Sequence, residues 1–251
     1  MAFNKKRGRT TYGQFLVEGI REIEMAIDSG LQPDEILFNR HWQPDDLTKF
    51  QSKLTEAKSF VTDDIVFEKI SYRDSVANAV AVFPLFNTEL NSLKLPDNPL
   101  VLVLEAIEKP GNLGAIFRTA DAAGVDAIII SNANTDFYNP NVIRASLGTV
   151  FSVPFAIASN EETLAFLQSN TFEIYSTYLA GSVPHFDVDM VKNTALVMGS
   201  EAFGISPFWI DNTSQCIKIP MRGKADSMNV STAAAVVVYE AIRQRTGNTS
   251  A

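Results

Sequence analysis

The sequence predicts an α/β protein in two parts, a small α/β domain followed by a larger domain built on a parallel sheet. Apolar strand-like runs alternate with helical patterns along most of the chain. In the second part these runs are apolar at successive positions, as in Leu100–Ile107, which is typical of strands covered on both faces. An aperiodic stretch with prolines separates the two parts. The predicted organisation is a basic arm at 1–12, a small domain at 13–86, a linker at 87–98 and the sheet domain at 99–251.

Composition limits the classes of function. The 251 residues are 46% hydrophobic, which is enough for a sizeable core. A single cysteine, Cys216, excludes an internal disulfide, and the two histidines, His41 and His185, lie far from other potential ligands in sequence, so we expect no metal site. No apolar window reaches the length of a membrane span, and we expect a cytoplasmic protein with no membrane partner. The net charge of -8 argues against a surface that binds nucleic acid everywhere, but it allows a local basic site.

The small domain follows an arm that we expect to be disordered until it binds a partner. Apolar residues at helical spacing predict a helix over Phe15–Gly30, which the glycine ends. Asp63 is placed to cap a short helix that runs to Ile70. Short apolar runs predict strands at 35–39, 59–62 and 79–84, and a polar amphipathic helix is expected at 44–57.

The larger domain alternates strictly between strand and helix. Strands are predicted at 100–107, 127–131, 155–158, 173–178, 195–198 and 216–220, with helices at 112–123, 141–147, 161–168 and 207–212 and a last one from Val230. Ligands of such sheets bind at the carboxyl ends of the strands. The loops after Ile107, Met198 and Pro220 are therefore the candidates for a site.

The first of these loops opens a helix and carries two polar candidates. Asn112 is placed to cap the helix, and Arg118 follows just under two turns later, so both side chains are expected near the same end of the sheet. The glycines of this loop lack the G-x-G-x-x-G spacing, which excludes a dinucleotide site of that type. The alternative for Arg118 is a surface ion pair with Asp121.

The second loop has Gly199 and Gly204 at P-loop separation, but Ile205 stands where the lysine is needed. A nucleoside triphosphate site is therefore excluded. Two glycines directly after a buried strand permit the backbone to approach a ligand closely. Glu201 between them is the polar candidate, and a solvated turn carboxylate is its alternative.

The third loop lies between a short strand and a helix rich in alanine and valine. Asn229 or Ser231 is expected to cap that helix. The alternative to a site is simply a capped core helix after a polar turn. The polar residues that would gather at the mouth of the apolar core are Arg222, Lys224, Asp226, Ser227 and Asn229.

Taken together, the three loops resemble the SpoU (TrmH) family within the SPOUT superfamily of RNA methyltransferases. The matching residues are Asn112-x-Gly114-x-x-x-Arg118, then Gly199-x-Glu201-x-x-Gly204-Ile-Ser, and finally Ile219-Pro-Met followed by Ser227-Met-Asn229-Val-Ser231. The resemblance covers residues 99–247. Met228 departs from the leucine that is common in the family, and both residues are apolar and flexible. The N-terminal part is more loosely similar to the small substrate-binding domain that many members carry.

This resemblance implies a deep trefoil knot in the C-terminal domain, S-adenosylmethionine bound in the knot, a homodimer that completes the site, and an RNA-binding N-terminal domain. The implied cofactor-binding residues are Met198, Gly199, Gly204, Ile219, Met221 and Met228. The implied catalytic residues are Arg118, Asn112, Glu201, Ser227 and Asn229. The cations expected to contact RNA by their position are Arg144, Arg222, Lys224, Lys5, Lys6, Arg7 and Arg9, and solvated loop charges are the alternative for the first three.

The proton of the ribose 2′-hydroxyl raises a chemical question. By resemblance Arg118 takes it, but an ordinary arginine stays charged and is not a base. Either binding lowers the pKa of Arg118 strongly, or Arg118 holds an RNA phosphate and polarises the hydroxyl while another group accepts the proton. Physical chemistry favours the second interpretation, in which Glu201, Ser227 and Asn229 orient Arg118 and the ribose.

The expected activity is methyl transfer from S-adenosylmethionine to a ribose 2′-oxygen in structured RNA. A guanosine or adenosine of large-subunit ribosomal RNA is the preferred target, because the separate N-terminal domain resembles that of rRNA-modifying members. A tRNA methyltransferase is one alternative. A non-catalytic RNA-binding or ribosome-assembly protein is another, although it would be expected to lack Arg118 or Asn229. A base-methylating SPOUT relative is disfavoured by the Ser227-Met-Asn229 match.

Overall fold

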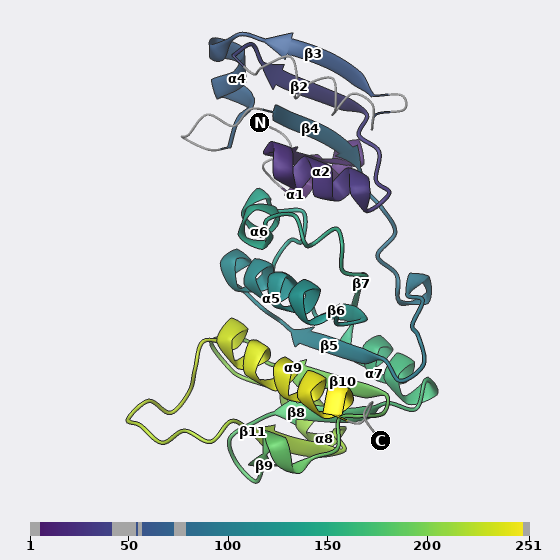
Figure 1. The fold of residues 1–251 in the computed structure, drawn as a ribbon, viewed down its shortest axis with the longest axis vertical. Coiled ribbons are helices and arrows are strands. Elements are labelled where there is room, and N and C mark those ends of the chain that lie inside the picture. Colours follow the sequence, from purple (N-terminus) through teal and green to yellow (C-terminus); the bar gives the residue numbers. More distant parts are fainter. Residues whose placement is uncertain (1–5, 42–53, 55–56, 73–78, 248–251) are drawn as a thin grey trace. The chain divides into compact units, whose positions relative to one another are not determined.

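The structure is a computed structural model that describes residues 6–41, 54, 57–72 and 79–247. The chain divides into two compact units (Figure 1). Unit 1 consists of Met1–Phe86 with Asp136–Ser152, and unit 2 consists of Asn87–Thr135 with Val153–Ala251. The sheet domain was predicted as one continuous segment, 99–251, whereas residues 136–152 group with unit 1.

Unit 1 is built on a four-stranded sheet of order β1-β4-β2-β3. Strand β4 pairs antiparallel with β1 and β2, and β3 runs parallel to β2. The predicted strands and the predicted cap are confirmed, since the Asp63 carboxylate accepts a hydrogen bond from the Val66 N–H over 2.9 Å. The elements are α1 (Lys6–Tyr12), β1 (Gln14–Glu18), α2 (Ile20–Asp28), β2 (Glu35–Asn39), β3 (Lys58–Thr62), α4 (Asp64–Ile70), β4 (Ala79–Pro84) and α6 (Pro140–Ser146).

Two predictions for the start of the chain are wrong. The residues from Phe15 to Glu18 were expected in a helix, but they form β1, because this buried run pairs along its whole length with β4. The arm expected to be disordered is helical over Lys6–Tyr12. Arg9 is only 4% exposed and forms an ion pair with Asp136, so it does not present its charge to a phosphate. Lys5 and nearly all of the helix predicted at 44–57 lie outside the described residues.

Aromatic packing explains why residues 136–152 belong to unit 1. The Phe15 ring centroid lies 4.8 Å from that of Tyr138 and 6.0 Å from that of Phe151. Tyr138 also packs edge-on against Phe86 at 5.6 Å. Such ring pairs stabilise the fold by more than the burial of their apolar area alone. Arg144, which lies on α6, is therefore an exposed cation of unit 1.

Unit 2 is built on a seven-stranded parallel sheet of order β7-β6-β5-β10-β8-β11-β9. The predicted strands and helices of this part are confirmed, and the two-residue strand β9 was not predicted. The trefoil knot implied by the family resemblance stays a prediction. The elements are β5 (Leu100–Glu105), α5 (Pro110–Ala123), β6 (Ala127–Ser131), β7 (Phe155–Ala158), α7 (Asn160–Ser169), β8 (Glu173–Thr177), β9 (Val183–Pro184), β10 (Thr194–Met198), α8 (Pro207–Asp211), β11 (Gln215–Lys218) and α9 (Val230–Gly247).

Helices cover the buried strands of unit 2. Leu167 of α7 and Trp209 of α8 pack into one core cluster with alternate residues of the central strands, such as Val101 and Val103. Helix α9 crosses the front of the sheet beside α5 in Figure 1. The predicted linker is not loose, because its three leucines, at 90, 93 and 95, pack against the same core cluster. This packing holds residues 90–95 against the core of unit 2.

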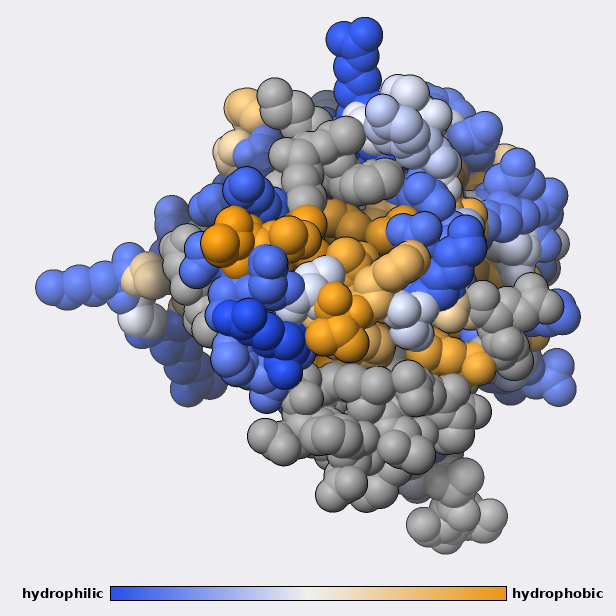
Figure 2. Space-filling view, turned by 90° about the horizontal axis from the view of Figure 1, so that it is seen from above, coloured by the Kyte–Doolittle hydropathy of each residue, from blue (hydrophilic) through white to orange (hydrophobic). Residues whose placement is uncertain are grey.

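The described surface of unit 1 includes an apolar edge. Figure 2 shows apolar side chains gathered among hydrophilic ones on the face that it presents. Exposed large apolar side chains of unit 1 include Phe60 and Val61 on β3. The unit 1 cations that were expected to contact RNA lie elsewhere, with Lys6 and Arg7 exposed on α1 and Arg144 on α6. None of the helices in the described ranges has both the length and the apolar character needed to cross a bilayer.

Candidate active site

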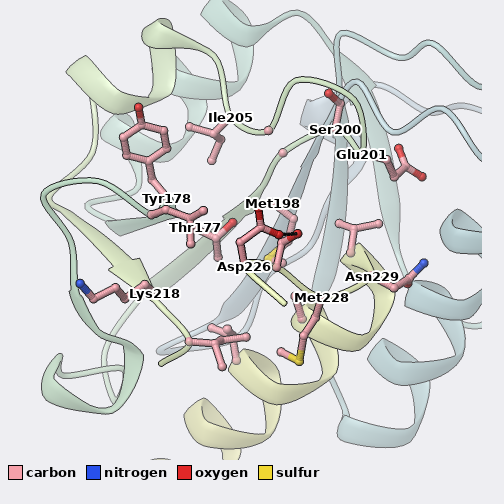
Figure 3. Close-up of a pocket in the computed structure, with 18 of the residues that line it drawn as sticks. Thr177, Tyr178, Met198, Ser200, Glu201, Ile205, Lys218, Asp226, Met228 and Asn229 are labelled. Atoms are coloured by element: carbon pink, nitrogen blue, oxygen red, sulfur yellow. Dashed lines mark hydrogen bonds between the residues drawn. The ribbon is translucent and has the colours of Figure 1, made fainter. Parts of the chain in front are cut away.

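A cavity of about 620 Å³ opens at the carboxyl ends of β8, β10 and β11, beside the start of α9 (Figure 3). This volume lies within the range of roughly 300–1,000 Å³ that is usual for small-molecule sites. The second and third predicted loops both line it. All the residues predicted to bind the cofactor are among its lining residues: Met198, Gly199, Gly204, Ile219, Met221 and Met228.

The cavity has an apolar interior and two polar ends. Met198, Ile205 and Ile217 are buried side chains of its wall, and Val237 of α9 adds a fourth. Figure 3 shows Glu201 and Asn229 at one end, while Tyr178 and Lys218 lie toward the other. An apolar interior with a few polar groups is what binding of a nucleoside-like ligand requires.

A chain of hydrogen bonds joins the three predicted loops at the first of these ends. The Asn112 side chain donates from Nδ2 to Glu201 Oε1 over 2.6 Å. Its Oδ1 atom accepts a hydrogen bond of 3.1 Å from Asn229 Nδ2. Asn229 Oδ1 in turn accepts from the Ser231 N–H over 2.9 Å, which caps α9. The structure thus brings Asn112, Glu201 and Asn229 together, and it selects Asn229 as the predicted cap.

Asn112 does not cap its own helix, contrary to the prediction. Helix α5 begins at Pro110, and Lys109 occupies the position before it. Asn112 therefore sits within the first turn. This placement leaves its side chain amide available for Glu201 and Asn229, which is why the residue serves the site and not the helix.

Glu201 is held as a carboxylate. Partial burial by itself would raise its pKa, but hydrogen bonds from the Asn112 side chain and the Glu108 N–H, over 3.2 Å, outweigh this and lower the pKa below the ordinary glutamate value. Glu201 is therefore negatively charged at neutral pH. The alternative of a solvated turn carboxylate does not describe it, because both its oxygens accept hydrogen bonds.

The glycines of the second loop let its backbone fold onto itself. Ser200 and Gly204 exchange two backbone hydrogen bonds of 2.9 and 3.0 Å. A Cβ atom on Gly199 would lie 2.2 Å from the Gly204 carbonyl carbon, and Gly204 has a φ of 68°. The glycines were expected to let the backbone approach a ligand closely. They also let the backbone at Gly199 approach the backbone at Gly204, and this contact fixes the shape of the cavity wall.

Other predicted residues lie apart from this polar end. Ser227 lines the cavity, and its hydroxyl donates to Asp226 over 3.1 Å. Arg118 is exposed on α5, does not line the cavity, and has no hydrogen bond or ion pair to any described residue, Asp121 included. Arg222 and Lys224 are exposed in the loop before α9 and do not line the cavity.

A buried polar cluster beneath the second loop was not predicted. Glu105, at the end of β5, is 4% exposed. Its carboxylate accepts hydrogen bonds from the Ser206 N–H over 2.8 Å, from the Ser206 hydroxyl, and from Asn160 Nδ2 over 2.8 Å. Ser206 directly follows the cavity residues Gly204 and Ile205. Glu105 therefore anchors the far end of the loop that forms one cavity wall.

The sequence prediction also missed the contribution of β8. Thr177 and Tyr178 line the cavity, as do Lys109 and Lys218. A signal for the first pair was present, because Thr177 ends a buried parallel strand and residues 178–180 follow it, just as the three chosen loops follow theirs. In the part of the chain that the structure describes, no three His, Cys, Asp or Glu side chains are grouped as a metal site requires.

Comparison with known proteins agrees with this geometry. Residues 99–239 match the SpoU rRNA Methylase family, and residues 1–81 match the MRM3-like substrate binding domain. The 23S rRNA (uridine(2479)-2′-O)-methyltransferase of Streptomyces viridochromogenes is 29% identical over 247 residues, covering 94% of this chain and 85% of the relative. The 23S rRNA (guanosine(2553)-2′-O)-methyltransferase RlmP of Bacillus subtilis is 29% identical over 235 residues, covering 93% of this chain and 90% of the relative.

Solved structures give the same assignment. The SpoU methyltransferase AviRb from Streptomyces viridochromogenes, in complex with the cofactor AdoMet, superposes with a TM-score of 0.89 at 26% identity, covering 98% of this chain and 96% of that one. An RNA 2′-O ribose methyltransferase superposes with a TM-score of 0.84 at 32% identity, covering 97% and 93%. The matched family region spans the parallel sheet and all three site loops. The chain therefore belongs to the SpoU rRNA methylase family and is an S-adenosylmethionine-dependent methyltransferase.

Proposed function

We propose that the protein methylates the 2′-hydroxyl of a ribose in large-subunit ribosomal RNA, with S-adenosylmethionine as the methyl donor. The observation that carries this proposal is the Asn229–Asn112–Glu201 chain of hydrogen bonds at the polar end of an apolar cavity. It provides a fixed carboxylate and fixed amides where a sugar hydroxyl has to be oriented. Orientation is the main requirement, because the methyl group of the cofactor is already activated when the cofactor is bound.

The cavity residues fit the cofactor. The buried side chains of Met198, Ile205 and Ile217 offer an apolar surface for an adenine ring, and Asp226 and Thr177 offer polar groups beside it. Backbone groups near Gly199 and Ile219 would hold the nucleoside. Ser227 and Asn229 also line the cavity, and Asn229 lies at its polar end with Glu201.

The polar end orients the acceptor. Glu201 is charged and already accepts two hydrogen bonds, so it serves as a fixed acceptor for a ribose hydroxyl or an arginine, and not as a strong base. Asn112 and Asn229 hold one another in a single amide orientation. The 2′-hydroxyl gives up its proton to solvent water as its oxygen takes the methyl group, while these side chains keep the oxygen in line.

We assign Arg118 to the site of a second copy of the chain. Arg118 is exposed and does not line the cavity of its own chain, although its place in the family motif implies a catalytic role. A homodimer that brings Arg118 of one protomer to the cavity of the other would supply the arginine of the family motif. There it holds an RNA phosphate and polarises the hydroxyl, because an arginine is a permanent charge.

Ribosomal RNA is the proposed substrate because the relatives that match most of the chain bear names of 23S rRNA methyltransferases. Their named targets are a uridine and a guanosine, so the names of the relatives do not favour the expected purine over a pyrimidine. Lys6, Arg7 and Arg144 of unit 1, with Arg222 and Lys224 of unit 2, are the exposed cations that we assign to RNA contacts. The cytoplasm is the proposed location, because the named relatives are rRNA methyltransferases of bacteria.

The test is methyl transfer to defined RNA pools. The protein is incubated with S-adenosyl-[methyl-³H]methionine and with separate unmodified transcripts of 23S rRNA and of tRNAs, and the labelled RNA is digested to nucleosides. A labelled 2′-O-methylnucleoside from 23S rRNA supports the proposal. Label only in tRNA favours the tRNA alternative, label on a base excludes ribose methylation, and cofactor binding without any transfer favours a non-catalytic RNA-binding protein.

A further inference from the structure

Phe203 lies at the rim of the cavity with its ring in water. It is 88% exposed, the highest value among the exposed large apolar side chains of the described ranges, and it still lines the cavity. Tyr178 and Leu179 are further exposed apolar side chains of the same cavity. The cavity therefore has exposed aromatic and aliphatic side chains at its rim.

The backbone presents this ring rigidly. Ser200 and Gly204 close the turn with two backbone hydrogen bonds, and the Phe203 N–H donates to Ser200 Oγ over 3.1 Å. The turn is also packed tightly against Gly199, which has no room for a side chain. A ring on such a turn meets its ligand without the entropic cost of ordering a loop.

The same turn carries the polar end of the site. Glu201, two residues before Phe203, is fixed by Asn112 across 2.6 Å. The position of the ring is therefore tied to the place where the ribose is oriented. The buried interior, with Met198 and Ile217, already provides the apolar surface for the adenine of the cofactor. The exposed Phe203 ring therefore remains available to the second ligand of the proposed reaction, the RNA with its aromatic bases.

Resting on the proposed function, we propose that Phe203 stacks on the nucleobase of the nucleotide whose ribose is methylated. Proteins read single-stranded RNA by stacking splayed bases on aromatic side chains. Such stacking tolerates any base, because every base has a π-face. Phe203 then anchors the target nucleotide beside Glu201, and the choice of base is made elsewhere.

The experiment compares the Phe203→Ala, Phe203→Leu and Phe203→Trp variants with the wild type, on an unmodified 23S rRNA transcript and with tritiated cofactor. Phe203→Ala is expected to raise the KM for RNA by about 5- to 150-fold, the range for removal of one stacked base, while the KM for S-adenosylmethionine stays within about twofold. Phe203→Trp is expected to keep the wild-type KM for RNA, whereas Phe203→Leu behaves like Phe203→Ala because leucine has no π-face.

Four outcomes would overturn the inference. Full activity of Phe203→Leu would mean that only apolar bulk matters. A parallel rise in the KM for the cofactor would place the ring on the cofactor, and a loss of dimer in sedimentation would place it in an interface between protomers. Unchanged RNA kinetics in Phe203→Ala would reject this inference alone. A wild-type enzyme that transfers no methyl group to 23S rRNA would instead reject the proposed function, and with it the nucleotide that the ring is assigned to bind.

Discussion

Asn112 and Glu201, 89 positions apart in the sequence, are joined by a hydrogen bond of 2.6 Å from Nδ2 to Oε1. The other end of the same amide accepts a hydrogen bond from Asn229. An amide has one donor end and one acceptor end, so only one orientation of Asn112 satisfies both neighbours. The side chain therefore couples the start of α9 to the carboxylate of the second loop.

Replacement of Asn112 should lower kcat more than cofactor affinity. Asn112→Ala removes a hydrogen bond to a charged group, which is worth about 1.5–3 kcal/mol, so kcat is expected to fall by roughly 10- to 100-fold. Asn112→Asp should be worse, because its carboxylate cannot donate to Glu201 and repels it. Single-turnover methyl transfer measures the first effect and calorimetric titration of S-adenosylmethionine the second. A loss of cofactor affinity with an unchanged kcat would contradict the assigned role.

The pH dependence should follow Glu201. The folded protein stabilises the charged form of Glu201. The stability that Glu201 contributes to the fold is therefore complete above the ordinary glutamate pKa and is lost as the pH falls through the lowered pKa. The fall of kcat at low pH (its acid limb) that protonation of Glu201 causes is therefore expected at pH values below the usual glutamate pKa. Asn112→Ala removes the hydrogen bond that lowers the pKa and should move this limb upward. Identical acid limbs in the two proteins would show that Glu201 does not control the profile.

Gly199 should tolerate no side chain. A Cβ atom there would lie 2.4 Å from the Ile205 nitrogen as well as against Gly204, and both obstacles are backbone atoms. Overpacking of this kind costs about 1–3 kcal/mol, so Gly199→Ala is expected to weaken cofactor binding by roughly tenfold or more. Gly111→Ala is the matched control, because a Cβ atom at Gly111 meets nothing within 4 Å. Calorimetry showing equal affinities for the two variants would remove the second loop from the cofactor site.

Glu105 should stabilise the fold through Ser206 and Asn160. Glu105→Ala leaves buried donors without an acceptor and is expected to lower the free energy of unfolding by about 2–4 kcal/mol. Ser206→Ala keeps the backbone N–H and should cost less. Urea denaturation measures both changes. Equal losses in the two variants would mean that the Ser206 hydroxyl, and not the carboxylate with its other donors, holds the end of the loop.

Mixed dimers should reveal the partner of Arg118. Arg118→Ala and Gly199→Val homodimers are each expected to lose methyl transfer. A dimer with one copy of each variant retains an intact cavity on one protomer and Arg118 on the other, so activity should return to about half that of wild type per dimer when the site is shared. Co-expression with two affinity tags isolates this mixed dimer. A mixed dimer as inactive as its parents would place Arg118 in the site of its own chain.

Much of unit 2 was predictable because parallel strands leave a strong pattern. Buried strands appear as unbroken apolar runs, and the loops at their carboxyl ends follow directly from them. The polar residues of those loops could therefore be predicted from the sequence. The pairing of Asn112 with Glu201 could not, since no local pattern reports a contact between two distant loops.

The residues that were mispredicted share one cause, which is a partner far away in the sequence. The segment from Phe15 to Glu18 continues the helical spacing of the residues after it, but pairing with β4 makes it a strand. Arg9 looks like part of a free basic arm until Asp136 is placed beside it. Glu105 interrupts an apolar run, and its meaning depends on Ser206, 101 positions later. Tertiary contacts decided each of these cases against the local signal.

The cavity draws its walls from nearly the whole of unit 2, from Lys109 at the start of α5 to Val237 on the last helix. A ribosome releases these segments in order, so the cavity wall is incomplete until Val237 has emerged. The cofactor site is therefore assembled only after α9 has been synthesised, whereas the strands of unit 1 emerge earlier. A nonsense mutation before α9 would remove Val230, Ala233 and Val237 from the cavity wall, so the shortened chain is expected not to bind its methyl donor.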